Sequence, residues 1–260
     1  MRSGDLHLRT RGERPRHENP VVLQHPVRFP ATVLILAAIC LLAAACSSSS
    51  NNSSAALAPA AAEAQLKQIV LQPTDAGADF AQDQAVAQTN DDLAKARPDT
   101  EAARRQYADW GQVLQYNVQY SAPVAPDLVF SGKIARVMNT ATLFASAGGA
   151  GSALAYTRGL PESTVANFLV NDAGGTKISD TQVVKDIAFP AKGDESFTWR
   201  ITGKAMFPDG FTVVFVADAV FVRAGRVNGT VTAVAFGQAP KRDDVIALVD
   251  RFVERARVPG

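Results

Sequence analysis

Residues 211–236 decide the fold. They read FTVVFVADAVFV at 211–222, RAGR at 223–226 and VNGTVTAVAF at 227–236. The first run is almost continuously apolar, with one charge at Asp218. The last run includes Asn, Gly and Thr among its apolar residues but is equally rich in β-branched residues. Such runs on either side of a Gly-containing tetrapeptide predict a β-hairpin, and Asn228-Gly229 suggests a bulge in the returning strand. A long antiparallel hairpin of this kind predicts a sheet with a buried centre.

Two further segments show the two-residue period of strands. In QVLQYNVQYS at 112–121, Leu and Val alternate with amides and Ser, and the two tyrosines fall on the apolar side. Residues 197–202 alternate Phe, Trp and Ile with Thr and Arg. The pattern predicts strands with one face in the core and one face toward solvent.

Helices are expected around this sheet. Pro98 cannot lie inside a helix, so a helix is predicted to start near Asp99 and run to Trp110. A last helix follows Pro240, with acids toward its start, arginines toward its end and one apolar stripe. The stripe consists of Val245, Leu248, Val249, Phe252 and Ala256.

The segment between residues 145 and 171 is less regular. Its run Gly148-Gly149-Ala150-Gly151 is predicted to break a strand, with helices beginning at Ser152 and near Pro161. With these elements the sequence predicts a single α+β domain, a twisted antiparallel sheet packed against helices.

The first 45 residues are predicted to be a signal peptide. A basic segment leads into ATVLILAAICLLAAA at 31–45, which fits the roughly 7–15 residues of a secretory apolar region better than the roughly 20 of a membrane span. Because the basic segment is long, we expect translation to start near Val27. The small residues before Cys46 resemble a bacterial lipobox, although Ala43 stands where Leu is usual, and this resemblance implies a diacylglyceryl group on Cys46.

Residues 46–62 are expected to join the lipid to the domain. After Cys46 they read SSSSNNSSAALAPAAA, a composition typical of a solvated tether, so the extracytoplasmic domain is predicted to span residues 63–260. A diacylglycerol holds a protein on a membrane durably, since each buried CH₂ contributes roughly 0.8 kcal/mol. The protein is therefore expected on the outer face of the cell membrane.

Composition excludes several kinds of chemistry. The chain has 260 residues, 47% of them hydrophobic and 20% charged. All three histidines (residues 7, 17 and 25) and Cys40 precede Cys46, so the mature chain has neither a histidine nor a free thiol for nucleophilic catalysis or a His-ligated metal. Six of the 26 basic and three of the 25 acidic residues also precede Cys46, which leaves 20 basic and 22 acidic residues in the mature chain. This balance disfavours a nucleic-acid partner.

Carboxylates are the remaining acid–base groups. The adjacent pairs Asp91-Asp92, Asp194-Glu195 and Asp243-Asp244 leave open a hydrolase that uses carboxylates alone. Each pair falls at an expected turn or helix start, where capping is the more common role. No cofactor-binding or Ca²⁺-loop spacing is present, so neither a cofactor nor a metal is expected.

Aromatic residues gather between positions 107 and 120. Tyr107, Trp110, Tyr116 and Tyr120 could line a groove for an apolar or sugar ligand. Alternatively they fill the interface between the helix at 99–110 and the strand that follows it.

The chain also resembles a known group of proteins. The lipobox, the Ser/Asn tether, Gly193-Asp194-Glu195, the hairpin at 220–227 and the closing helix through residues 250–253 resemble small lipoproteins of GC-rich Gram-positive bacteria. The body, from about 66 to 256, is similar to secreted domains of the PsbP-like or LpqN type. The resemblance implies an antiparallel sheet packed against helices and brings no catalytic residues.

The expected function is therefore non-enzymatic. The sequence predicts a lipid-anchored module that binds an apolar or envelope-derived ligand. The alternative is an interaction module that docks on another envelope protein, and a carboxylate-only hydrolase is a more distant one.

Overall fold

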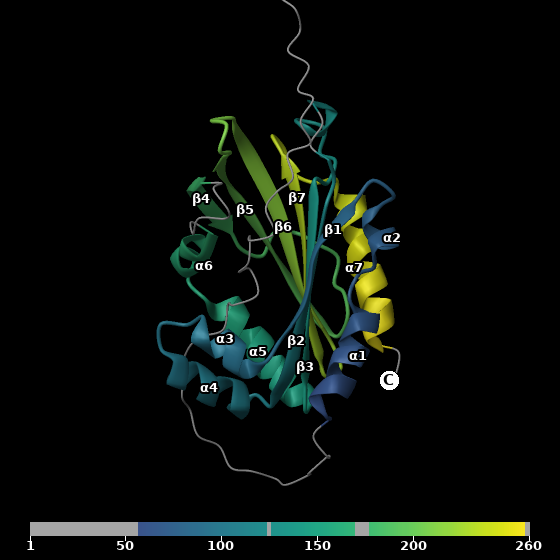
Figure 1. The fold of residues 1–260 in the computed structure, drawn as a ribbon, viewed down its shortest axis with the longest axis vertical. Coiled ribbons are helices and arrows are strands. Elements are labelled where there is room, and N and C mark those ends of the chain that lie inside the picture. Colours follow the sequence, from purple (N-terminus) through teal and green to yellow (C-terminus); the bar gives the residue numbers. More distant parts are fainter. Residues whose placement is uncertain (1–56, 124–125, 170–176, 258–260) are drawn as a thin grey trace, which may run out of the picture.

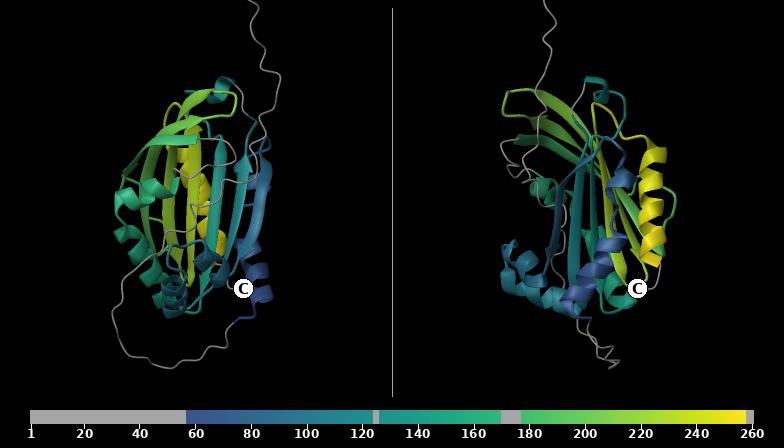
Figure 2. Two further views of the ribbon diagram at one scale, coloured as in Figure 1. Left: turned by 60° about the vertical axis from the view of Figure 1, so that its left-hand side comes forward. Right: turned by 45° about the vertical axis from the view of Figure 1, so that its right-hand side comes forward.

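A computed structural model describes residues 57–123, 126–169 and 177–257, and the signal peptide, Cys46 and most of the tether lie outside them. The described strands form one seven-stranded sheet in the order β1-β2-β3-β7-β6-β5-β4, with every neighbouring pair antiparallel. Helices cover both faces, α1, α2 and α7 on one and α3 to α6 on the other (Figure 1; Figure 2). The predicted α+β fold with an antiparallel sheet is confirmed.

The strands and helices have the following bounds. The strands are β1 (Ala81–Gln88), β2 (Gln112–Ser121), β3 (Arg136–Phe144), β4 (Lys177–Val184), β5 (Glu195–Met206), β6 (Thr212–Ala224) and β7 (Val227–Phe236). The helices are α1 (Pro59–Ile69), α2 (Pro73–Ala76), α3 (Asn90–Lys95), α4 (Thr100–Asp109), α5 (Ala147–Gly159), α6 (Glu162–Leu169) and α7 (Arg242–Arg257), with a 3₁₀ turn at Pro126–Leu128.

The hairpin predicted at 211–236 forms β6 and β7. Ala224 pairs with Val227, so a two-residue turn joins the strands, and Gly225 takes a φ of 58° that favours glycine. The expected bulge at Asn228-Gly229 is wrong, because the register runs through both residues without a shift. Gly229 instead makes room for α7: a Cβ there would lie 2.2 Å from the ring of Phe252.

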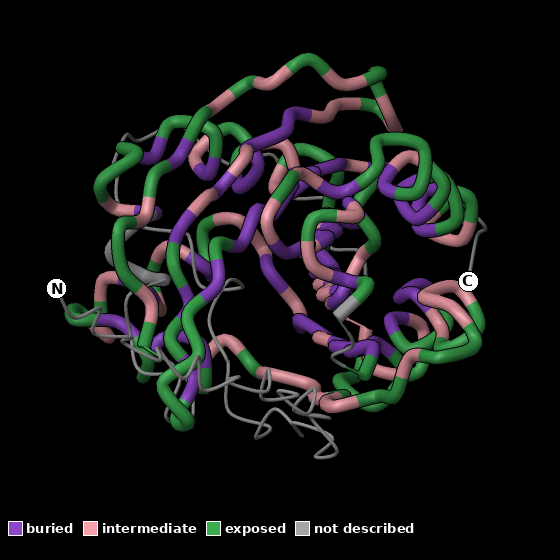
Figure 3. The backbone as a smooth tube through the Cα atoms, turned by 90° about the horizontal axis from the view of Figure 1, so that it is seen from above, coloured by how far each residue is buried: buried purple, intermediate pink, exposed green. Residues whose placement is uncertain are grey.

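The largest core lies between the sheet and α1 and α7. The predicted stripe of the last helix is buried, apart from the half-buried Ala256, and packs against β6 and β7. Acidic residues occupy the first turn of α7 and arginines its last turn, as the sequence predicted. Seen from above, the helices show buried residues on their inner sides and exposed residues outside (Figure 3).

The folded domain begins earlier than the sequence suggested. Pro59 begins α1, and Ala62 and Leu66 are fully buried. The last four residues of the expected tether therefore belong to the fold. An Ala-rich run after a proline can begin a helix once its apolar side has a sheet to pack on.

Helix starts on the opposite face follow local capping. The side chain of Asp99 accepts a hydrogen bond from the backbone of Ala102, so α4 begins at the next residue, as predicted within one position. The strand expected to break at Gly148–Gly151 ends at Phe144, and the prediction of a helix beginning at Ser152 is wrong, because Ser146 caps α5 and the glycines lie in its first turns. Gly149 allows close packing: a Cβ there would lie 1.9 Å from the carbonyl oxygen of Trp110.

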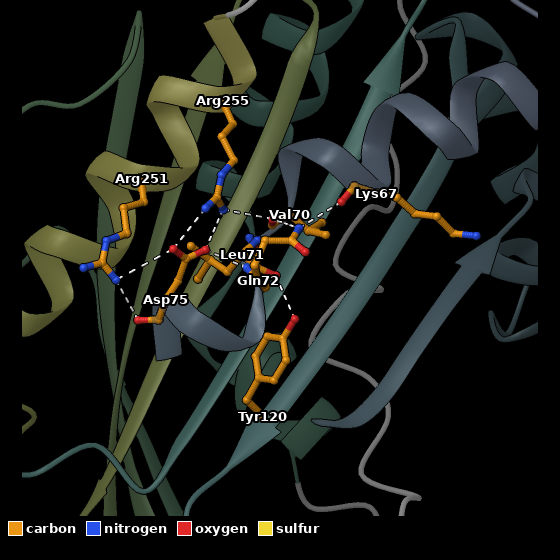
Figure 4. Close-up of polar contacts among 9 residues, drawn as sticks. Lys67, Val70, Leu71, Gln72, Asp75, Tyr120, Arg251 and Arg255 are labelled. Carbon is orange, nitrogen blue, oxygen red and sulfur yellow. Dashed lines mark hydrogen bonds and ion pairs between the residues drawn. The ribbon is translucent and has the colours of Figure 1, made fainter. Parts of the chain in front are cut away.

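A polar clasp fixes the link between α1 and α2 to the rest of the fold (Figure 4). The carboxylate of Asp75 accepts from the guanidinium of Arg255 at 2.6 and 3.0 Å and from the backbone N–H of Gln72 at 2.6 Å. The hydroxyl of Tyr120 donates to the carbonyl of Leu71 at 2.8 Å. The clasp therefore joins α2 to α7 through charge-assisted bonds and the α1–α2 link to β2 through a neutral one.

The clasp also perturbs two pKa values. Burial by itself would raise the pKa of Asp75, but the bonds from Arg255 and Gln72 and the charge of Arg251 outweigh it and hold the pKa below its ordinary value. Burial, with the nearby charge of Asp75, raises the pKa of Tyr120 to about 12. Both groups are thus held in the protonation state that their hydrogen bonds require at neutral pH.

Candidate functional site

The four aromatic residues singled out in the sequence lie on opposite faces of the sheet. Tyr116 and Tyr120 belong to the core beneath α1 and α7. Tyr107 is buried in a small cluster with α3, and Trp110 packs beside it, with ring centroids 6.2 Å apart. The four side chains therefore do not line a common groove, since the two tyrosines of β2 face α1 and α7 whereas Tyr107 and Trp110 lie with α3 on the other side of the sheet.

The second face of β2 is polar and yet largely buried. Gln115 and Gln119 are each 4% exposed, whereas the alternation pattern predicted that this face meets solvent. Strands β1 and β3 flank β2 and carry polar side chains on the same face, and α3 and α4 pack beside it. The polar face is thus part of the interior.

Uncharged side chains connect three strands on this face. We call this set the polar stripe; its members are Gln88, Gln115, Asn117, Thr140 and Thr142. Asn117 donates to the side-chain oxygen of Gln88 at 2.5 Å and accepts from the hydroxyl of Thr140 at 2.7 Å. Because each amide both donates and accepts, the stripe is preorganised without any charge.

A pocket opens at the end of the polar stripe nearest α4 and α5. Its volume is ≈ 60 Å³, and we call it the polar pocket. The residues that line it are Leu93, Tyr107, Gln112, Gln115, Thr140, Thr142, Phe144, Ala153, Leu154, Thr157, Phe221, Asn228, Gly229 and Thr230. All of these side chains are uncharged, and three rings form part of the wall.

Two amides in the polar pocket keep an unused hydrogen-bonding atom. Gln112 is 8% exposed, and its Nε2 is buried without a hydrogen-bond partner in the described part of the chain. Asn228 donates through Nδ2 to the carbonyl of Ala150 at 2.7 Å, which leaves its buried Oδ1 without a partner there. Buried polar atoms are usually paired, so two open ones in one pocket mark a place where a ligand can bind.

The sequence analysis did not single out Gln112 or Asn228. It treated the polar residues of β2 as a solvent face, which the strand pattern alone supports. A signal was nevertheless present, because residues 112–121 carry amides and no charges. Solvent-facing strands more often carry charged side chains, so a run of amides was compatible with a buried polar surface.

The acidic pairs have structural partners. Asp91 pairs with Lys95 at 2.7 Å and with Arg104 at 2.6 Å, and Asp92 forms a capping box with Thr89. Asp194 accepts from the backbone of Gly225 at 2.7 Å. None of these carboxylates lines the polar pocket.

Asp243 and Asp244 occupy the first turn of α7. Over the described ranges, no three His, Cys, Asp or Glu side chains are placed to hold a metal ion. The pairs thus act as caps and turn contacts in the fold.

A second pocket, of ≈ 550 Å³, lies between α2, the start of α7 and the link from β2 to β3. Phe80, Leu128, Ile134 and Leu248 contribute apolar walls, and Asp79, Asp127 and Asp244 also line it. These three carboxylates are on exposed residues. Unlike the polar pocket, it is lined by charged side chains, and one of them, Asp127, pairs with Lys133 at 2.5 Å.

Comparison with known proteins gives little further guidance. No family model and no curated protein sequence matches the chain. One solved structure, the extracellular domain of PknH from Mycobacterium tuberculosis, is similar at a TM-score of 0.43 with 13% identity, over 75% of this chain and 95% of that one. At that level the likeness supports no inference about function. Among the described helices, none is long and apolar enough to cross a membrane.

Proposed function

We propose that the protein is a non-enzymatic binding module held by a lipid on Cys46 at the outer face of the cell membrane, and that the polar pocket receives its ligand. The observation that carries the proposal is the pair of unpartnered amide atoms on Gln112 and Asn228 in one pocket whose described lining residues are uncharged. The absence of histidine from the mature chain supports binding rather than catalysis. The two open amide atoms favour an envelope-derived polar ligand over an apolar one.

Native mass spectrometry tests the binding role. The full chain is purified from a bacterial membrane fraction in a polyoxyethylene detergent, which carries no sugar headgroup. We expect a small non-covalent mass that disappears on unfolding and that the Gln112→Met variant does not retain. A protein mass without any adduct in wild type, after extraction from several envelope fractions, would contradict the proposal.

The lipid anchor has its own test. Cleavage after Ala45 and diacylglyceryl transfer would give a mature protein whose mass includes the lipid on Cys46. The Cys46→Ser variant should lack the added mass of the lipid, because the serine hydroxyl does not replace the thiol in thioether formation. Cys40→Ser serves as the matched control. Lipid on the Cys46→Ser variant would refute the assignment.

An interaction module remains the second candidate, and exposed apolar side chains favour it. At the end of the β5–β6 hairpin, Phe211 is 50% exposed, and Met206 and Val214 are also exposed. Phe211→Ser and Val214→Ser should remove crosslinks to an envelope protein without changing thermal stability. Unchanged crosslinks in both variants would reject this surface.

A further inference from the structure

The two open amide atoms define what a ligand must offer in the polar pocket. Asn228 uses Nδ2 to bind the carbonyl of Ala150, so the free end of its amide is the acceptor Oδ1. Gln112 presents a donor, Nε2. A buried polar atom without a partner destabilises a fold by about 1–3 kcal/mol, and such positions persist where function needs them. The complementary ligand group carries one acceptor and one donor.

The lining also excludes ligands by charge. Among the residues that the structure describes, no Asp, Glu, Lys or Arg side chain lines the polar pocket. A phosphate, carboxylate or ammonium group would lose its hydration there without gaining a counter-charge, which is strongly unfavourable. The ligand group must therefore be neutral.

An acetamido group meets both requirements. Its carbonyl oxygen can accept from Gln112 and its N–H can donate to Asn228, while its methyl group meets apolar wall residues such as Phe144 and Leu154. The volume of ≈ 60 Å³ has room for roughly four to six water-sized groups, which suits an acetamido substituent but not a whole sugar ring.

The surroundings of the pocket suit the rest of a sugar. Of the polar stripe, Gln88, Asn117 and Thr140 are half-buried and offer an amide or hydroxyl whose orientation is fixed by mutual hydrogen bonds, and Tyr107 adds an aromatic wall. Sugar hydroxyls need many neutral donors and acceptors of this kind. We propose that the polar pocket binds the acetamido group of an uncharged N-acetylated amino sugar. This inference rests on the proposed function, which places a ligand in the same pocket.

Saturation-transfer NMR with four probes tests the inference on the full chain in polyoxyethylene detergent. The probes are N-acetyl-D-glucosamine, glucose, glucosamine and N-acetyl-L-alanine methylamide. We expect N-acetyl-D-glucosamine to bind with the strongest saturation on its acetyl methyl, and the other three to bind at least tenfold more weakly. Equal binding of glucose would overturn the role of the acetamido group. Preference for the methylamide would assign the pocket to a peptide amide instead.

Variants separate a binding role from a structural one. Gln112→Met removes the open donor at similar side-chain volume, so affinity for N-acetyl-D-glucosamine should fall at least tenfold while the ligand-free thermal midpoint stays equal or rises. Gln119→Met, a buried amide of β2 outside the pocket, should keep wild-type affinity. A lowered midpoint with unchanged affinity for Gln112→Met would overturn the inference.

The outcomes also separate this inference from the proposed function. If no probe binds, but native mass spectrometry finds an envelope species that Gln112→Met loses, the pocket is the ligand site and only the sugar assignment fails. If neither is seen, both fail. The ranking of the four probes by wild type decides the inference even where the Met variant does not fold.

Discussion

Removing the charge of Asp75 should destabilise the whole domain, because this carboxylate is the centre of the clasp. Its side chain is 8% exposed and accepts two bonds from Arg255, at 2.6 and 3.0 Å. Hydrogen bonds to charged groups contribute about 1.5–3 kcal/mol each, and breaking a buried ion pair costs about 3–5 kcal/mol. Since Arg255 is 29% exposed and can regain water, we expect Asp75→Asn to lower the free energy of unfolding by about 2–4 kcal/mol.

The pH dependence gives a second signature of the same contact. The folded state lowers the pKa of Asp75, so its contribution to stability is fully present above the ordinary carboxyl pKa, near 3.8. That contribution is lost as the pH falls below 3.8 through the folded-state pKa. The stability difference between wild type and Asp75→Asn should therefore be constant near neutral pH and should shrink in acid.

Urea unfolding followed by tryptophan fluorescence measures both effects at pH 7 and at several values below pH 4. Asp79→Asn is the matched control, because it removes an exposed carboxylate four residues away. The reasoning is refuted if the two variants are equally stable at pH 7. It is also refuted if the difference between wild type and Asp75→Asn does not change in acid.

Two further substitutions test the packing and the clasp. Gly229→Ala should lower the free energy of unfolding by about 1–3 kcal/mol, because its Cβ would lie 2.2 Å from the ring of Phe252. Gly159→Ala, with open space around it, should not lower this free energy. Equal urea midpoints for the two variants would contradict this. Tyr120→Phe removes the bond to Leu71 and should cost about 1 kcal/mol. In wild type the pKa of Tyr120 is raised to about 12, so its contribution to stability is fully present below pH 10 and is lost as the pH rises from 10 through 12. The phenolate absorbance of wild type minus that of Tyr120→Phe isolates this group, and a difference that titrates near 10 would contradict the reasoning.

The strand pattern predicted the fold class well because it is a local property. The β6–β7 hairpin needs only an apolar run, a glycine turn and a second run, all within 26 residues, and the structure has it with Gly225 in the turn. The capping of α4 by Asp99 is equally local. Such features follow from neighbours in sequence, so they could be predicted.

Two of the predictions that failed concern glycines at contacts distant in sequence. Gly229 was expected to form a bulge and Gly149 to break a strand, yet each lies where another segment approaches the backbone closely, Phe252 in one case and Trp110 in the other. A single sequence shows that a glycine is present but not which segment approaches it. Its role therefore depends on the tertiary packing.

The sequence by itself determined the antiparallel hairpin and the position of all three histidines before Cys46, because each depends on residue identity and short-range order. The leader and the lipobox stay predictions from the same local information. Only the tertiary structure decided that the amides of β2 face the interior and that Gln112 and Asn228 meet in one pocket. Alternation separates the two faces of a strand, but burial of a face depends on the elements packed against it. That packing joins strands and helices far apart along the chain.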